Sequence, residues 1–140
     1  DVSLKALNDF VSRLDVSPVV HPMPVEADDL AMEAAQYAES LPERFDLIHL
    51  GLGADGHTAS LVPSDPVLAS VARVAVTGEY QGHRRMTLTY PVLNPSRRLL
   101  YLVTGADKHW ALGRLLDGDS GIPAGRVARD RALVIADRRP

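Results

Sequence analysis

Residues 46–63 read Asp-Leu-Ile-His-Leu-Gly-Leu-Gly-Ala-Asp-Gly-His-Thr-Ala-Ser-Leu-Val-Pro and are the most informative part of the chain. The first five of them, 46–50, have the length and apolar character of a buried β-strand. Gly51 and Gly53 follow at once, and glycines there allow a tight turn and a close approach of the backbone to a ligand. Because ligands bind at the carboxyl ends of strands in open α/β sheets, Asp55 and His57 lie where they could take part in proton transfer.

The remaining pattern predicts strands that alternate with helices. Apolar residues at 4, 7, 10, 11 and 14 predict a helix over 4–14. Asp28 and Asp29 predict the start of a second helix, which runs to about Leu41 and ends at Pro42. Further strands are predicted at 71–76, 85–90, 98–103 and 132–136, and loops near 63–66, 78–82 and 118–125. This order predicts an α/β fold with a largely parallel, Rossmann-like sheet and flanking helices, in a single domain over 1–140.

A third helix is predicted over 107–116, between the last two strands. We expect its apolar residues to pack on the sheet; they are Trp110, Leu112, Leu115 and Leu116.

Composition narrows the function classes. Apolar residues make up 46% of the 140 residues and charged residues 24%, as in ordinary globular proteins. The formal charge of −3 argues against a nucleic-acid partner, and no apolar run has the length of a membrane span or reads as a secretory signal. The absence of cysteine excludes disulfides and thiol nucleophiles. We expect a cytoplasmic protein without a metal or another cofactor.

The stretch from Gly51 to Leu61 resembles the signature of the 6-phosphogluconolactonases, in which a Gly-x-Gly turn is followed by Asp-Gly-His-Thr-Ala-Ser-Leu. Two later segments extend the resemblance. Residues 85–94, Arg-Met-Thr-Leu-Thr-Tyr-Pro-Val-Leu-Asn, are similar to the family's Arg-x-Thr-Leu-Thr-x-Pro-x-Leu-Asn segment. Residues 103–108, Val-Thr-Gly-Ala-Asp-Lys, are similar to its Val-x-Gly-x-x-Lys segment.

The resemblance implies an enzyme that hydrolyses 6-phospho-D-glucono-1,5-lactone to 6-phospho-D-gluconate in the oxidative pentose phosphate pathway. This is a carboxylic ester hydrolase acting on a lactone, without a metal. In that case His57 would be the general base that activates water, and Asp55 would orient its imidazole. Taken without the resemblance, His57 is more often a loop histidine that makes one backbone hydrogen bond.

Six further residues would bind the substrate by the same resemblance. Arg85 and Lys108 would hold the phosphate, Lys108 from the first turn of the helix predicted at 107–116, where the helix dipole favours an anion. The others line the loop after the first strand: Gly51, Gly53, Gly56 and Thr58. Composition alone would make both cations solvated surface residues.

Two alternatives to the lactonase remain. The glucosamine-6-phosphate deaminases and isomerases share the scaffold but carry a glutamate where this chain has Val62, which disfavours their chemistry. The resemblance also covers only the carboxyl-terminal part of the family's domain, so we expect an incomplete copy of it. The chain could therefore be a non-catalytic remnant that binds a sugar phosphate. The oligomeric state is not predicted.

Overall fold

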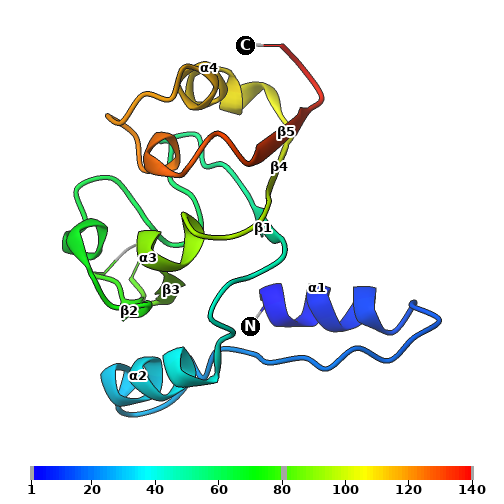
Figure 1. The fold of residues 1–140 in the computed structure, drawn as a ribbon, viewed down its shortest axis with the longest axis vertical. Helices are drawn as coiled ribbons and strands as arrows, with labels where there is room; N and C mark the ends of the chain where they lie inside the picture. Colours follow the sequence, from blue (N-terminus) through cyan, green and yellow to red (C-terminus); the bar gives the residue numbers. More distant parts are fainter. Residues whose placement is uncertain (1, 80–81, 140) are drawn as a thin grey trace.

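The computed structural model describes residues 2–79 and 82–139, and its elements alternate along the chain (Figure 1). The helices and strands are α1 (Val2–Val11), α2 (Leu30–Ser40), β1 (Ile48–Leu50), β2 (Val74–Val76), β3 (Met86–Leu88), α3 (Tyr90–Leu93), β4 (Leu99–Val103), α4 (His109–Asp117) and β5 (Ala132–Ala136). Short 3-10 turns lie at Pro66–Ala69, Ala106–Lys108 and Ala124–Arg126.

The central sheet is parallel and has the order β1-β4-β5. In its register Leu50 lies opposite Tyr101, and Tyr101 lies opposite Val134. The prediction of an α/β fold with a parallel sheet and flanking helices is therefore confirmed. Because β1 and β4 are neighbours, the segments that follow their carboxyl ends lie at the same edge of the sheet.

A second sheet consists of β2 and β3 in antiparallel pairing. The sequence predicted both strands, at 71–76 and 85–90, but they are shorter in the structure, and Tyr90 begins α3. It did not predict this pairing, which arises because a loop and not a helix connects the strands. Residues 80 and 81 of the loop predicted at 78–82 lie outside the described residues. Helix α2 packs on this sheet through a small cluster of Ala34, Val74 and Met86.

The two amino-terminal helices differ in how well the sequence predicted them. Helix α2 begins as expected, because one carboxylate oxygen of Asp29 accepts hydrogen bonds from the N–H groups of Ala31 and Met32 at 3.1 and 3.0 Å. Helix α1 forms, but it ends at Val11 and not at residue 14. Its apolar side chains at Leu7 and Phe10 are exposed, since no other described element covers them.

The prediction for the helix at 107–116 is partly wrong. Leu112 and Leu115 are buried together with Ala111, but Trp110 and Leu116 are 52% and 44% exposed. The helix buries only a narrow stripe, and Trp110 lies outside it, where the guanidinium of Arg114 stacks 4.8 Å from the centre of its ring. The helix also starts at His109, one residue after Lys108, so Lys108 lies in the preceding 3-10 turn and not in the first helical turn.

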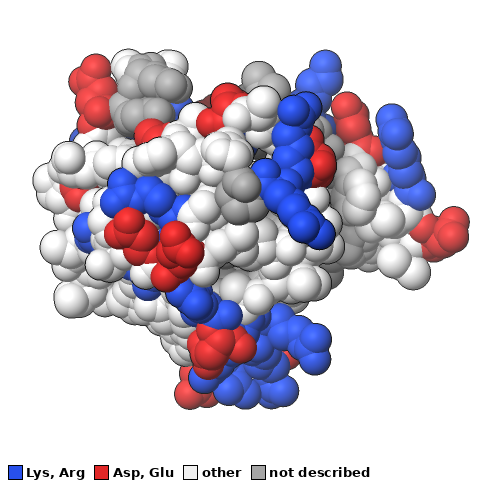
Figure 2. All heavy atoms as spheres, turned by 90° about the horizontal axis from the view of Figure 1, so that it is seen from above, with Lys and Arg blue, Asp and Glu red and all other residues white. Residues whose placement is uncertain are grey.

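The main core lies on one face of the parallel sheet. It is formed by side chains of β1, β4 and α4 and by the loops around them, including Leu50, Leu61, Tyr101, Leu112 and Ile122. On the face seen in Figure 2, basic and acidic side chains lie in mixed groups. Within the described part of the chain, no helix is long and apolar enough to cross a membrane.

Candidate functional site

The loop after β1 is closed by hydrogen bonds within itself. The N–H of Gly53 donates to the carbonyl of His57 at 2.9 Å, and the N–H of Gly56 donates to the carbonyl of Gly53 at 3.0 Å. The hydroxyl of Thr58 reaches back to the carbonyl of Gly51 at 2.8 Å. These bonds fix the backbone of the loop, and with it the positions of Asp55 and His57.

Asp55 and His57 form a close pair in this loop. Nδ1 of His57 lies 2.6 Å from Oδ1 of Asp55, and the same oxygen accepts the backbone N–H of His57 at 3.1 Å. Their side chains are 39% and 30% exposed, so the pair is open to solvent on one side.

The electrostatics of the pair assign the proton. Desolvation raises the pKa of Asp55, but the hydrogen bonds and charge of His57 outweigh it, and the net pKa lies below the usual value. Asp55 is therefore ionised at neutral pH and can only accept, so Nδ1 of His57 carries the hydrogen. The lone pair of the neutral imidazole is then on Nε2, the nitrogen that can take a proton from water.

Two of the three predicted glycines are required by packing. A Cβ at Gly53 would lie 2.1 Å from Nδ1 of His57, and one at Gly56 would lie 2.6 Å from Cβ of Ile122. Gly56 also has a φ of +84°, which side chains rarely adopt. Gly51 differs, because a Cβ there would meet nothing within 4 Å. The space beside Gly51 is open, as a close approach by a ligand requires.

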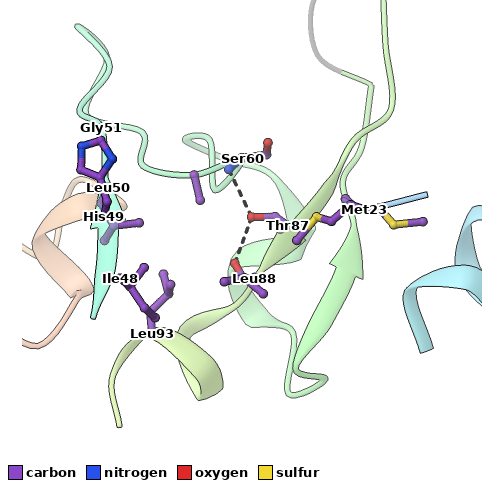
Figure 3. Close-up of a pocket in the computed structure, with 11 residues that line it drawn as sticks. Met23, Ile48, His49, Leu50, Gly51, Ser60, Thr87, Leu88 and Leu93 are labelled. Atoms are coloured by element: carbon purple, nitrogen blue, oxygen red, sulfur yellow. Dashed lines mark hydrogen bonds between the residues drawn. The ribbon is translucent and has the colours of Figure 1, made fainter. Parts of the chain in front are cut away.

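Thr58 and its neighbours support the loop from inside. Thr58 is fully buried, so its side chain faces the core in this structure. The N–H of Ser60 donates to the hydroxyl of Thr87 at 3.1 Å, which ties the loop to β3 (Figure 3). The N–H of Ala124 donates to the carbonyl of Gly56 at 3.0 Å. Sequence reasoning missed the supporting roles of Thr87, Ile122 and Ala124; the Arg-x-Thr segment was the available signal for Thr87.

Lys108 lies in the turn after β4, at the same sheet edge as the loop after β1. Its ammonium is 3.1 Å from a carboxylate oxygen of Asp107, and its side chain is 25% exposed. The turn is held by Asp137 at the end of β5, whose carboxylate accepts the N–H of Gly105 at 3.2 Å. Asp137 is a further supporting residue that the sequence did not reveal.

Arg85 was predicted to begin a strand over 85–90, but it lies directly before β3 and therefore next to the antiparallel sheet. Its backbone is fixed by Thr77: the N–H of Thr77 donates to the Arg85 carbonyl at 2.8 Å, and the Thr77 hydroxyl accepts the Arg85 N–H at 3.0 Å. The bond between Ser60 and Thr87 connects this strand to the loop of His57. Arg85 is thus linked to the loop of the pair through one short segment of β3.

No group of three His, Cys, Asp or Glu side chains that could hold a metal is present among residues 2–79 and 82–139. The pair places an imidazole next to an ionised carboxylate, and Arg85 and Lys108 each carry a positive charge.

The chain is similar to several known lactonases. It is 42% identical over 117 residues to the 6-phosphogluconolactonase of Synechocystis, an alignment that covers 76% of this chain and 49% of that protein. It is 40% identical over 113 residues to the 6-phosphogluconolactonase of Rattus norvegicus, covering 75% of this chain and 44% of that protein.

A solved structure shows the same likeness. The crystal structure of 6-phosphogluconolactonase from Thermotoga maritima superposes with a TM-score of 0.66 at 29% identity, over 75% of this chain and 50% of that chain. The chain thus spans about half the length of the curated relatives it matches.

Residues 4–135 match the family described as glucosamine-6-phosphate isomerases/6-phosphogluconolactonase. The resemblance of the loop after β1 is thus part of a match over nearly the whole chain, and the chain belongs to this family.

Proposed function

We propose that this chain supplies the general base for the hydrolysis of 6-phospho-D-glucono-1,5-lactone to 6-phospho-D-gluconate, a step of the oxidative pentose phosphate pathway. The observation that carries the proposal is the pair of Asp55 and His57, fixed at 2.6 Å after β1, in a chain whose curated relatives are 6-phosphogluconolactonases.

The chemistry follows from the proton positions. Nε2 of His57 takes a proton from a water molecule as that water attacks the carbonyl carbon of the lactone. The bond between this carbon and the ring oxygen then breaks, and the ring oxygen receives the proton from the imidazolium. Asp55 holds the tautomer and stabilises the imidazolium while it exists.

The phosphate of the substrate requires positive charge, and Arg85 and Lys108 are the proposed source. Lys108 lies at the sheet edge where β1 and β4 end, and Arg85 lies next to the strand that contacts the loop. The open space at Gly51 suits an approach of the sugar, whereas Gly53, Gly56 and Thr58 act through the shape of the loop.

A second candidate is a sugar-phosphate-binding protein without catalysis, which the half-length match to the relatives favours. Deaminase or isomerase chemistry is disfavoured, because Val62 is apolar and buried and offers no group for acid–base work. A cytoplasmic location and the absence of a nucleic-acid partner stay predictions.

The test compares wild-type protein with His57→Ala in lactone hydrolysis and in binding of 6-phosphogluconate. We expect the rate to fall by about 10²-fold or more, as is usual when a general base is lost, with little change in binding. His21→Ala, at an exposed histidine outside the site, is the matched control and should behave as wild type.

Each other outcome is informative. Near wild-type turnover in His57→Ala would remove His57 from the mechanism. A wild-type protein that binds 6-phosphogluconate but does not hydrolyse the lactone would establish the second candidate.

A further inference from the structure

A cavity separates β1 from the antiparallel sheet next to which Arg85 lies. The cavity has a volume of about 270 Å³ and lies between β1 and β3 (Figure 3). Its lining includes His49 and Gly51 on one side and Thr87 and Leu88 on the other. Close packing of side chains therefore does not fix the distance between β1 and β3 at this level, and the hydrogen bonds across the gap carry more of the positioning.

Hydrogen bonds connect the segment after β1 to both strands of the hairpin formed by β2 and β3. On the β3 side, the N–H of Ser60 donates to the hydroxyl of Thr87 (Figure 3). On the β2 side, the N–H of Gly78 donates to Oδ2 of Asp65 at 2.9 Å. A single bond would let the hairpin rotate about it, whereas bonds to both strands fix the orientation of the hairpin.

The carboxylate of Asp65 uses a different oxygen for each of two segments. Its Oδ1 accepts the N–H of Val67 at 2.8 Å and caps the 3-10 turn Pro66–Ala69, while its Oδ2 accepts the N–H of Gly78. The backbone N–H of Asp65 donates to the carbonyl of Val62 at 3.3 Å, which ties Asp65 to the segment after β1. Because the carboxylate has two oxygens, it accepts both N–H groups at once. A shorter side chain with one oxygen would reach only the nearer of them.

A short chain of hydrogen bonds leads from Gly78 to Arg85. The buried hydroxyl of Thr77 donates to the carbonyl of Gly78 at 2.8 Å. The same hydroxyl oxygen accepts the N–H of Arg85 at 3.0 Å, and the N–H of Thr77 donates to the Arg85 carbonyl at 2.8 Å. Gly78 is thus held at its N–H by Asp65 and at its carbonyl by Thr77, and the place of the Arg85 backbone depends on both contacts.

We propose that Asp65 is a positioning residue that sets the place of Arg85 relative to the loop of His57, and with it the affinity for the phosphate of the substrate. The proposal rests on the proposed function, since it takes Arg85 as a ligand of that phosphate. Asp65 acts through Arg85 and does not itself contact the phosphate.

The charge of Asp65 and its positioning role have opposite effects on phosphate binding. A negative charge near the site repels an anion, so removal of the charge alone would strengthen the binding of a phosphate. Loss of the bond to Gly78 would displace Arg85 and weaken it. The direction of the change in affinity therefore distinguishes the two roles.

The test uses Asp65→Ser in the 140-residue chain and measures the binding of 6-phosphogluconate by calorimetry. A serine hydroxyl is also a good cap, so the N–H of Val67 should keep its acceptor while the N–H of Gly78 loses its own. We expect Kd to rise about 10-fold, which is part of the loss expected when Arg85 is removed. The amide hydrogen of Gly78 should also exchange faster than in wild type.

A double variant tests whether Asp65 acts through Arg85. Asp65→Ser/Arg85→Ala should bind 6-phosphogluconate no more weakly than Arg85→Ala, because the residue that Asp65 positions is already absent. In lactone hydrolysis, Asp65→Ser should raise KM for the phosphorylated lactone and leave kcat unchanged. Loss of folded protein would instead lower the apparent kcat for the phosphorylated and the unphosphorylated lactone alike.

Asp46→Ser is the matched control for the change in charge. It removes a carboxylate that is 90% exposed and pairs with Arg97 on the surface. Its Kd for 6-phosphogluconate should equal that of wild type, and an equal rise of Kd in Asp46→Ser and Asp65→Ser would overturn the proposal.

The proposal is also overturned by an unchanged or lower Kd in Asp65→Ser, or by additive losses in the double variant. If Asp65→Ser does not fold, Asp65→Thr repeats the test, since threonine also caps through one hydroxyl. Failure of both variants to fold would make Asp65 a structural residue and overturn its positioning role. If wild type does not bind 6-phosphogluconate, the proposed function itself fails, and the exchange rate at Gly78 distinguishes this result from failure of the contact between Asp65 and Gly78.

Discussion

The loop after β1 and the segments that carry Arg85 and Lys108 differ in how the chain builds them. The loop holds Asp55 and His57 at 2.6 Å through hydrogen bonds between residues close in sequence. Lys108 depends on a turn held by Asp137 from β5, and Arg85 depends on the pairing of β2 with β3. The proposed base is therefore a local feature of the sequence, whereas the proposed phosphate site is a product of the tertiary fold.

The largest effect that separates the two regions concerns phosphate binding. A charge-assisted hydrogen bond contributes about 1.5–3 kcal/mol. Arg85→Ala or Lys108→Ala should therefore weaken binding of 6-phosphogluconate roughly 10- to 150-fold, measured by calorimetry. Arg85→Lys should recover only part of the loss, because an ammonium lacks the planar fork of a guanidinium.

The matched control for this prediction is Arg97→Ala, which removes a surface arginine that pairs with Asp46 and is 61% exposed. Its binding should equal that of wild type. An equal loss in Arg97→Ala would mean that overall charge, and not a phosphate site, governs the affinity.

A smaller effect, on folding stability, tests how closely the loop after β1 is packed around His57. Gly53→Ala places a methyl group where Nδ1 of His57 lies, at 2.1 Å, and overpacking of this kind costs about 1–3 kcal/mol of folding free energy. Gly51→Ala meets nothing within 4 Å and should leave stability unchanged. Urea denaturation of both variants checks this, and equal stability would show that the loop is less closely packed around His57 than the structure indicates.

The smallest effect concerns Tyr101, which is buried on β4 beneath the loop. Burial raises its pKa to about 12, although the nearby hydroxyl of Thr58 lowers it somewhat. Its hydroxyl still has no hydrogen-bond partner in bonding geometry among the described residues. Tyr101→Phe should therefore keep the stability of wild type within about 1 kcal/mol or exceed it, because no hydrogen bond is lost.

The same residue has a predictable pH dependence. The unfolded chain loses the tyrosine proton near pH 10.0 and the folded chain near 12. The contribution of Tyr101 to the free energy of unfolding is therefore complete below pH 10.0 and is lost as the pH rises to about 12. Denaturation curves of Tyr101→Phe should therefore not show this loss of folding stability at alkaline pH. If wild type and Tyr101→Phe lose the same stability at alkaline pH, the loss would come from groups other than Tyr101.

The sequence predicted those parts of the molecule that short-range patterns determine. The strand predicted at 46–50, which the structure has at Ile48–Leu50, and the cap of α2 at Asp29 depend on residues a few positions apart. The antiparallel pairing of β2 with β3 was missed, because it depends on how a loop returns the chain. Trp110 was misplaced for a similar reason: a helical pattern shows which residues are apolar, but the neighbouring elements decide how wide a stripe is buried.

The same distinction applies to the candidate site. The close pair of Asp55 and His57 was predictable, since only two positions separate them. The supports were not, because Ile122 reaches Gly56, and Asp137 reaches Gly105, across long stretches of sequence. Their roles become visible only when the folded chain brings distant segments into contact.

The most direct test of the account measures kcat/KM for the phosphorylated and the unphosphorylated lactone in His57→Ala and in Arg85→Ala. If His57 is the base, its loss should lower kcat/KM equally for both substrates, by about 10²-fold. If Arg85 binds the phosphate, its loss should lower kcat/KM for the phosphorylated lactone roughly 10- to 150-fold and leave kcat/KM for the unphosphorylated lactone nearly unchanged. A loss in Arg85→Ala that is equal for both substrates, or an unchanged rate in His57→Ala, would contradict the assignment of base and phosphate site.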